Sequence, residues 1–150
     1  MELSDELKKK DWLLSLPAGT VLKFKDFNLP YKKFEVVLYN DQDIIYFMII
    51  NSRPRKQDID SDRINNYVCL QAKDYKFLKE GPSFINCNVI RPKLIKDLLP
   101  EINENVELGK LSSDKIKEII EKVKKIDISP EKRDKIISAF EKVINNSVPT

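Results

Sequence analysis

The stretch that decides the fold is residues 34–50, FEVVLYNDQDIIYFMII. Its second half, 44–50, is an unbroken apolar run rich in β-branched and aromatic residues. A run of this length and composition is typical of a central strand that is covered on both faces. Because the polar residues 40–43 separate it from a shorter apolar run, the stretch predicts a β-hairpin.

Working outward from the hairpin, a further strand is expected before it. Residues 20–27 alternate in polarity, with Leu22 and Phe24 on one face and Val21 grouped with lysines on the other. This alternation predicts a half-buried strand.

After the hairpin, residues 51–66 are polar, with arginines and aspartates interleaved. The segment is too long for a tight turn, so we expect a mobile surface loop. The apolar residues 67–70 and 83–90 predict two more short strands beyond it.

Helices are expected at both ends of the chain. Ser4 is expected to cap a short helix that ends near residue 14. In the last third the apolar spacing changes to three and four, with Ser112 or Ser113 capping one helix and Ser129-Pro130 starting another. The apolar face of this last helix must be buried either on the chain's own sheet or in the groove of a partner.

These elements predict an α+β fold. We expect a single domain over residues 1–150, with a small β-barrel or curled sheet of about five to seven strands over 16–92. An N-terminal helix precedes the barrel, and C-terminal helices follow it over 112–146.

Composition narrows the classes of function. The chain has 150 residues, 41% hydrophobic and 34% charged, which is typical of a globular protein. No apolar run approaches the roughly 18 residues that span a bilayer, and the charged start does not resemble a secretory signal, so no membrane association and a cytoplasmic location are expected. The net charge of +3 permits a local nucleic-acid-binding patch.

The chain contains no histidine. The commonest metal ligand and the commonest general acid–base group are therefore missing, and neither a metal site nor a cofactor is expected. Catalysis would have to use carboxylates, Lys, Arg, Tyr or hydroxyl groups. Cys69 and Cys87 lie in apolar segments and are expected to be buried thiols.

Several segments follow one another in a familiar order. AGTV at 18–21 is followed by the lysine-bearing KKFEVVL at 32–38, and the apolar run at 44–50 then ends in Asn51-Ser52. SFINC at 83–87 and LGKLS at 108–112 come later. Over roughly residues 16–126, this order resembles the PemK/MazF toxin family, and its most specific piece is the LGKLS segment after the SFI strand.

The resemblance implies an SH3-like barrel and a type II toxin–antitoxin function. Members of this family commonly cut single-stranded RNA without a metal, and many act as homodimers inhibited by an antitoxin. By similarity, the catalytic positions are a basic residue at the start of the second strand, here Lys32 or Lys33, and a hydroxyl residue after the third strand, here Ser52 beside Arg53.

The chemistry agrees with these residue types. Attack by a ribose 2′-oxygen on the adjacent phosphate requires a proton acceptor, a proton donor and positive charge near the phosphate oxygens. The remaining basic residues near these positions are the expected RNA-phosphate contacts, Arg55, Lys56, Arg63 and Arg91.

Two functions remain open. The first is a metal-independent endoribonuclease. The second is a catalytically degenerate relative that binds and regulates a protein partner, such as an antitoxin, a transcription factor or another signalling component. The family usually has an arginine followed by proline in the slot that here reads Lys32-Lys33-Phe34, and lysine does not reproduce the bidentate contact of arginine with phosphate.

Overall fold

The structure is a computed structural model, and it describes residues 2–25, 32–79, 81–102, 106 and 108–147. Among these residues, seven strands form one curled, antiparallel half-barrel sheet. The strands are β1 (Thr20–Lys25), β2 (Lys32–Asp41), β3 (Ile44–Asn51), β4 (Tyr67–Gln71), β5 (Pro82–Asn86), β6 (Arg91–Leu94) and β7 (Leu108–Lys110). Their order is β4-β5-β3-β2-β1-β7, and β6 also pairs with β3.

The predicted hairpin is confirmed as the β2–β3 pair. The strands extend further into the turn than expected, because Asp41 pairs with Ile44. Gln42 makes the turn with a left-handed backbone, φ 55°. A register shift between Val37 and Tyr39 adds a bulge to β2, and bulges of this kind curl a sheet.

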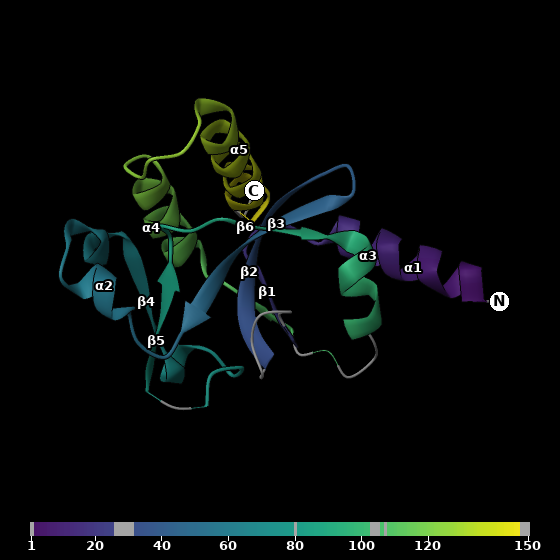
Figure 1. Cartoon of the computed structure of the whole chain (residues 1–150), viewed down its shortest axis with the longest axis horizontal. Coiled ribbons are helices and arrows are strands. Elements are labelled where there is room, and N and C mark those ends of the chain that lie inside the picture. The colour runs from purple at the N-terminus through teal and green to yellow at the C-terminus, as the bar shows by residue number, and fades with distance from the viewer. Residues whose placement is uncertain (1, 26–31, 80, 103–105, 107, 148–150) are drawn as a thin grey trace.

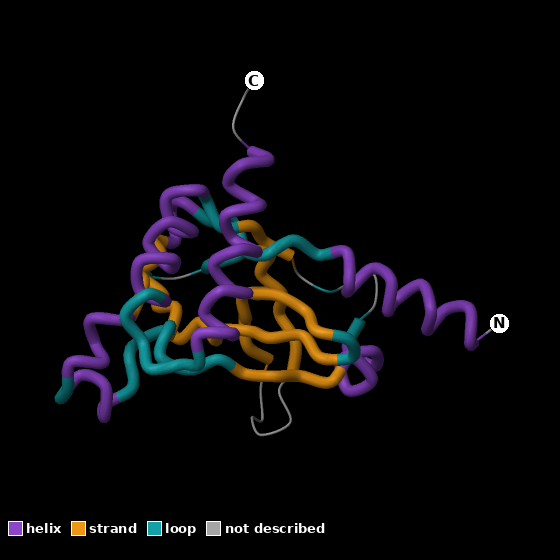
Figure 2. The backbone as a smooth tube through the Cα atoms, turned by 90° about the horizontal axis from the view of Figure 1, so that it is seen from above, coloured by secondary structure: helices purple, strands orange, loops and turns teal. Residues whose placement is uncertain are grey.

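The helices differ in length and position. The α-helices are α1 (Glu2–Ser15), α2 (Lys56–Ile59), α3 (Ile95–Leu98), α4 (Ser113–Val123) and α5 (Pro130–Ser147), and the short 3-10 helices are η1 (Asp62–Asn66), η2 (Ala72–Asp74) and η3 (Leu99–Glu101). Figure 1 shows α1 and α3 at one end of the sheet and α2 beside β4 at the other. Seen from above, α1 leads away from the sheet to the N-terminus (Figure 2).

Both faces of the sheet are covered. One core packs strand residues such as Val21 against α4 and α5, and a second core packs Leu22 against α1 and α3. Val21 and Leu22 are therefore both 0% exposed. The prediction that β1 is half-buried was wrong for Val21, which helices cover, whereas Lys23 is partly buried and Lys25 is exposed on the same face.

The predicted C-terminal helices are confirmed. Ser112 is the cap of α4, where its Oγ accepts from the Lys115 amide at 3.3 Å. Ile136 and Phe140 on α5 are 0% exposed within the first core. The apolar face of α5 is thus buried on the chain's own sheet, which removes one reason to expect a partner groove there.

Three predicted segments differ from the structure. The strand expected over 83–90 ends at Asn86, and the separate strand β6 follows it. β7 pairs with β1, so the sheet extends beyond the expected limits of 16–92. The loop expected over 51–66 contains α2 and η1, which are held together by ion pairs to the buried Asp58.

No helix among the described residues combines the length and the hydropathy that a membrane span needs.

Candidate functional site

A hollow of about 710 Å³ opens where β3 leaves the sheet. We call it the cationic pocket. It is lined by residues from β2, the end of β3, the following segment with α2, and the β5–β6 connection: Lys33, Ile49, Asn51, Ser52, Arg53, Pro54, Arg55, Lys56, Ile59, Asn86, Val89 and Arg91.

The charged side chains that line this pocket are all positive. Five lining residues are lysine or arginine, and none of those that the structure describes there is aspartate or glutamate. A concave surface with charges of one sign focuses the electrostatic potential and concentrates counter-ions. The pocket is therefore suited to an anionic ligand, and its arginines match phosphate in particular.

The structure brings most of the predicted site residues together. Ser52, Arg53 and Lys33 line the cationic pocket, and so do three of the four expected phosphate contacts: Arg55, Lys56 and Arg91. The fourth, Arg63, is not among the lining residues; it contacts Asp58.

The two candidate lysines of β2 separate. Neighbouring residues on a strand point to opposite faces, and of the two lysines Lys33 lines the cationic pocket. The Lys33 ammonium donates to Asn51 Oδ1 at 2.9 Å, which holds it beside Ser52. Lys32 lines a different, adjoining hollow. Of the pair, Lys33 is thus the one placed with Ser52 and Arg53.

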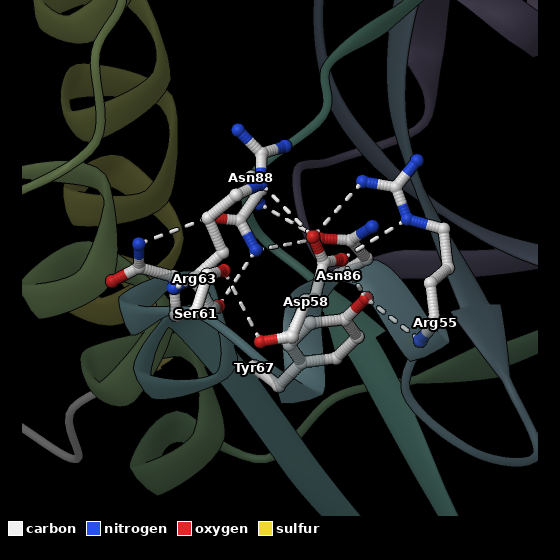
Figure 3. A network of polar contacts seen from close by, with 8 residues as sticks. Arg55, Asp58, Ser61, Arg63, Tyr67, Asn86 and Asn88 are labelled. Carbon is white, nitrogen blue, oxygen red and sulfur yellow. Dashed lines mark hydrogen bonds and ion pairs between the residues drawn. The ribbon is translucent and has the colours of Figure 1, made fainter.

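Behind the pocket wall, a buried carboxylate organises the segment between β3 and β4. Asp58 on α2 is 0% exposed and lies between two arginines, above the hydroxyl of Tyr67 (Figure 3). Arg55 Nε is 3.0 Å from Asp58 Oδ2, and Arg63 Nε is 2.9 Å from Asp58 Oδ1. Tyr67 donates a short hydrogen bond to Asp58 and accepts one from the Arg55 amide at 3.2 Å.

The network keeps Asp58 ionised. Burial by itself raises the pKa of this carboxyl, but hydrogen bonds from Tyr67, Arg55 and Arg63 outweigh burial, so the pKa lies below its ordinary value. Burial and the bond to Asp58 raise the pKa of Tyr67. The bond to Asp58 likewise raises the pKa of Arg55. The segment is fixed because a buried charge needs its partners in place.

Asparagines connect this network to β5. Asn88 Nδ2 donates to the Arg63 carbonyl at 2.9 Å, and Asn66 Nδ2 donates to Asn88 Oδ1 at 2.9 Å. Asn86 Oδ1, at the end of β5, accepts from the Asn88 backbone N–H at 3.0 Å. These bonds fix the position of η1 relative to the strand end that also lines the cationic pocket (Figure 3).

Sequence reasoning missed the two buried carboxylates on this side of the molecule. Asp58 reads as one of three aspartates in a polar segment, although its spacing of three from Arg55 was a usable signal for a helical ion pair. Glu35 is 0% exposed and lies two residues from Lys33 on β2, on the same strand face. Nothing in the local sequence distinguishes it from an exposed strand residue.

Among the residues that the structure describes, no three or more Cys, Asp or Glu side chains are grouped so that they could hold a metal ion. The polar groups available in the pocket are hydroxyl, amide, ammonium and guanidinium groups.

The sequence matches no protein-family model and no curated protein. What the site can do therefore follows from its own residues. They offer a Ser52 hydroxyl, an ammonium held by Asn51, and guanidinium groups around one concave surface. This arrangement can bind a phosphodiester and stabilise additional negative charge on its oxygens.

Proposed function

We propose that this chain is a metal-independent endoribonuclease of the PemK/MazF type that binds single-stranded RNA in the cationic pocket. The observation that carries the proposal is the convergence of Ser52, Arg53 and Lys33 on one surface that has no acidic side chain in its described lining. The proposal includes an SH3-like identity for the curled sheet, which its antiparallel strands and attached helices support.

In this proposal each residue type has a distinct task. Arg53 and Arg91 hold the phosphate by charge and by paired hydrogen bonds. The Ser52 hydroxyl donates to a non-bridging oxygen. The ribose 2′-oxygen attacks phosphorus as its proton leaves to solvent, and the bond to the 5′-oxygen breaks while the Lys33 ammonium donates a proton to it. The products are a 2′,3′-cyclic phosphate and a 5′-hydroxyl end.

The test is incubation of single-stranded RNA with the protein in EDTA, followed by analysis of the new ends by mass spectrometry. We expect cyclic phosphate ends. Arg53→Ala and Ser52→Ala are expected to slow cleavage by about 100-fold or more, as the loss of one oxyanion contact does in other enzymes. Lys125→Ala, which removes an exposed lysine in the turn after α4, is the matched control and should cut normally.

A measurement of RNA binding tests the binding part of the proposal separately from the cleavage part. Loss of one phosphate contact should lower the salt slope of single-strand binding by about 0.7 in Arg53→Ala but not in Lys125→Ala. RNA that is bound but stays intact would overturn the nuclease proposal and favour a degenerate, regulatory module. RNA that is neither bound nor cut would overturn the proposed function altogether.

A further inference from the structure

A second hollow adjoins the cationic pocket. It has a volume of about 280 Å³ and shares Lys33, Asn51 and Ser52 with the pocket. We call it the aromatic hollow, because Phe34 and Phe77 also line it. The three shared residues form the boundary between a surface rich in arginine and one that contains aromatic rings. A chain that lay across this boundary would meet both surfaces.

The apolar part of the hollow is firmly built. The rings of Phe34 and Phe77 lie 5.1 Å apart between centroids, at 52° to each other. Beneath them, Ile50 is 5% exposed and Leu78 is 9% exposed. Phe77 also lies so close to Gly109 that a Cβ there would overlap the ring. The aromatic surface is thus fixed by β2, β3 and β7 together.

The polar part of the hollow consists mainly of hydrogen-bond donors. Lys23 Nζ lies 5.1 Å from the centroid of the Phe34 ring, and Lys32 and Lys79 line the hollow beside it. The shared Asn51 already accepts from Lys33 through its Oδ1. An ammonium group only donates, so the hollow favours a flat ligand that carries acceptor oxygens at its edge.

We propose that the aromatic hollow binds one nucleobase of the RNA strand whose phosphate lies at Ser52, and that it prefers uracil and guanine, which carry a carbonyl oxygen where cytosine and adenine carry an amino group. This inference rests on the proposed function. The volume of the aromatic hollow lies just below the roughly 300–1,000 Å³ of typical ligand pockets, which suits one base and not a larger group. Aromatic side chains bind unpaired bases of single-stranded RNA by stacking, and hydrogen bonds to the base edge then select among them.

The experiment measures binding of short single-stranded oligonucleotides by fluorescence anisotropy. The oligonucleotides carry 2′-O-methyl groups on every ribose. These groups prevent attack by the 2′-oxygen, so binding is measured without cleavage. One position carries uracil, guanine, adenine, cytosine or no base. The wild-type protein should lose about 5- to 150-fold in affinity when the base is removed, which corresponds to the stacking of a single base. Uracil and guanine should bind more tightly than cytosine and adenine.

Variants test whether the aromatic hollow is responsible for the dependence of affinity on the base. In Phe34→Leu, the base-bearing and abasic oligonucleotides should bind within about threefold of each other, because the stacking surface is lost. Tyr46→Leu removes a half-buried aromatic residue that lines neither hollow and should keep the full dependence on the base. If Phe34→Leu does not fold, the exposed Lys79 provides a second variant: Lys79→Ala should reduce the preference for uracil over cytosine.

The outcomes are distinct. Equal affinity of the wild-type protein for abasic and base-bearing oligonucleotides would overturn this inference and leave RNA binding in place. Equal affinity for all four bases would overturn the preference for uracil and guanine. No binding of any oligonucleotide would instead overturn the proposed function.

Discussion

Asp58→Asn is the substitution that tests the buried network most directly. Asparagine has nearly the same shape as aspartate, so the change removes the charge without opening a cavity. The Tyr67 hydroxyl and the guanidinium groups of Arg55 and Arg63 then face a neutral amide, whose NH₂ group points hydrogen-bond donors at other donors. Three partners lose their charged acceptor at once.

The size of the effect follows from burial. Removing one partner of a fully buried ion pair typically costs about 3–5 kcal/mol. Here only Asp58 is fully buried, since the side chains of Arg55 and Arg63 are 37% and 50% exposed and water can take up part of their charge. We therefore expect a loss of about 2–3 kcal/mol. For a chain of this size, that loss lowers Tm by roughly 4–12 °C.

Thermal unfolding at pH 7, followed by circular dichroism, measures this loss. Asp60→Asn is the matched control, because Asp60 is an exposed aspartate of the same segment. If Asp58→Asn melts within about 2 °C of Asp60→Asn, the network does not stabilise the fold and the explanation for the ordered segment fails.

The pH dependence provides a second check. The pKa of Asp58 in the folded chain lies below its ordinary value of 3.8, so the unfolded chain binds more protons between the two values. The stabilisation is therefore complete above the ordinary pKa and is lost as the pH falls through the folded one. The Tm difference between the wild-type protein and Asp58→Asn should be full at pH 7 and shrink below about pH 4.

Two further predictions concern packing. Gly109→Ala should lower Tm, because the new methyl group overlaps the Phe77 ring, and the cost should largely disappear in the Phe77→Ala background. Equal costs in both backgrounds would show that the ring is not the obstacle. Cys87 is 0% exposed, and burial raises its pKa to about 12, so iodoacetamide should label the half-buried Cys69 first in the native protein. Equal labelling rates, measured by mass spectrometry, would contradict this burial.

Local patterns predicted the parts of the fold that local interactions specify. The β2–β3 hairpin follows from two apolar runs around a polar turn, and the start of α4 follows from the cap at Ser112. β6 and β7 were missed because each is short and acquires its structure only by pairing, β6 with β3 and β7 with β1. No periodicity develops over three or four residues.

The candidate site, like the fold, could be predicted from the sequence only in part. The resemblance to the PemK/MazF toxin family pointed to Ser52, Arg53 and the lysine pair, and the structure places most of the predicted site residues in one pocket. The choice between Lys32 and Lys33 depends on strand register, because a shift of one residue exchanges the two faces. Likewise, Asp58 differs from its neighbouring aspartates only through Tyr67 and the two arginines, which long-range folding brings to it.

β3 is shared between the two ends of the sheet. Ile44–Phe47 pair with β6, Ile50 and Asn51 pair with β5, and β2 runs along the other side of the strand. Because both ends of the sheet depend on this strand, its loss should unfold them together, and we expect global unfolding to be a single cooperative event. A ligand bound just after Asn51 would then stabilise the whole molecule, by about 2.7 kcal/mol when its concentration is 100 times its Kd. The melting temperature would rise accordingly. A thermal-shift screen of nucleotides and oligonucleotides can therefore find ligands of this chain without an activity assay.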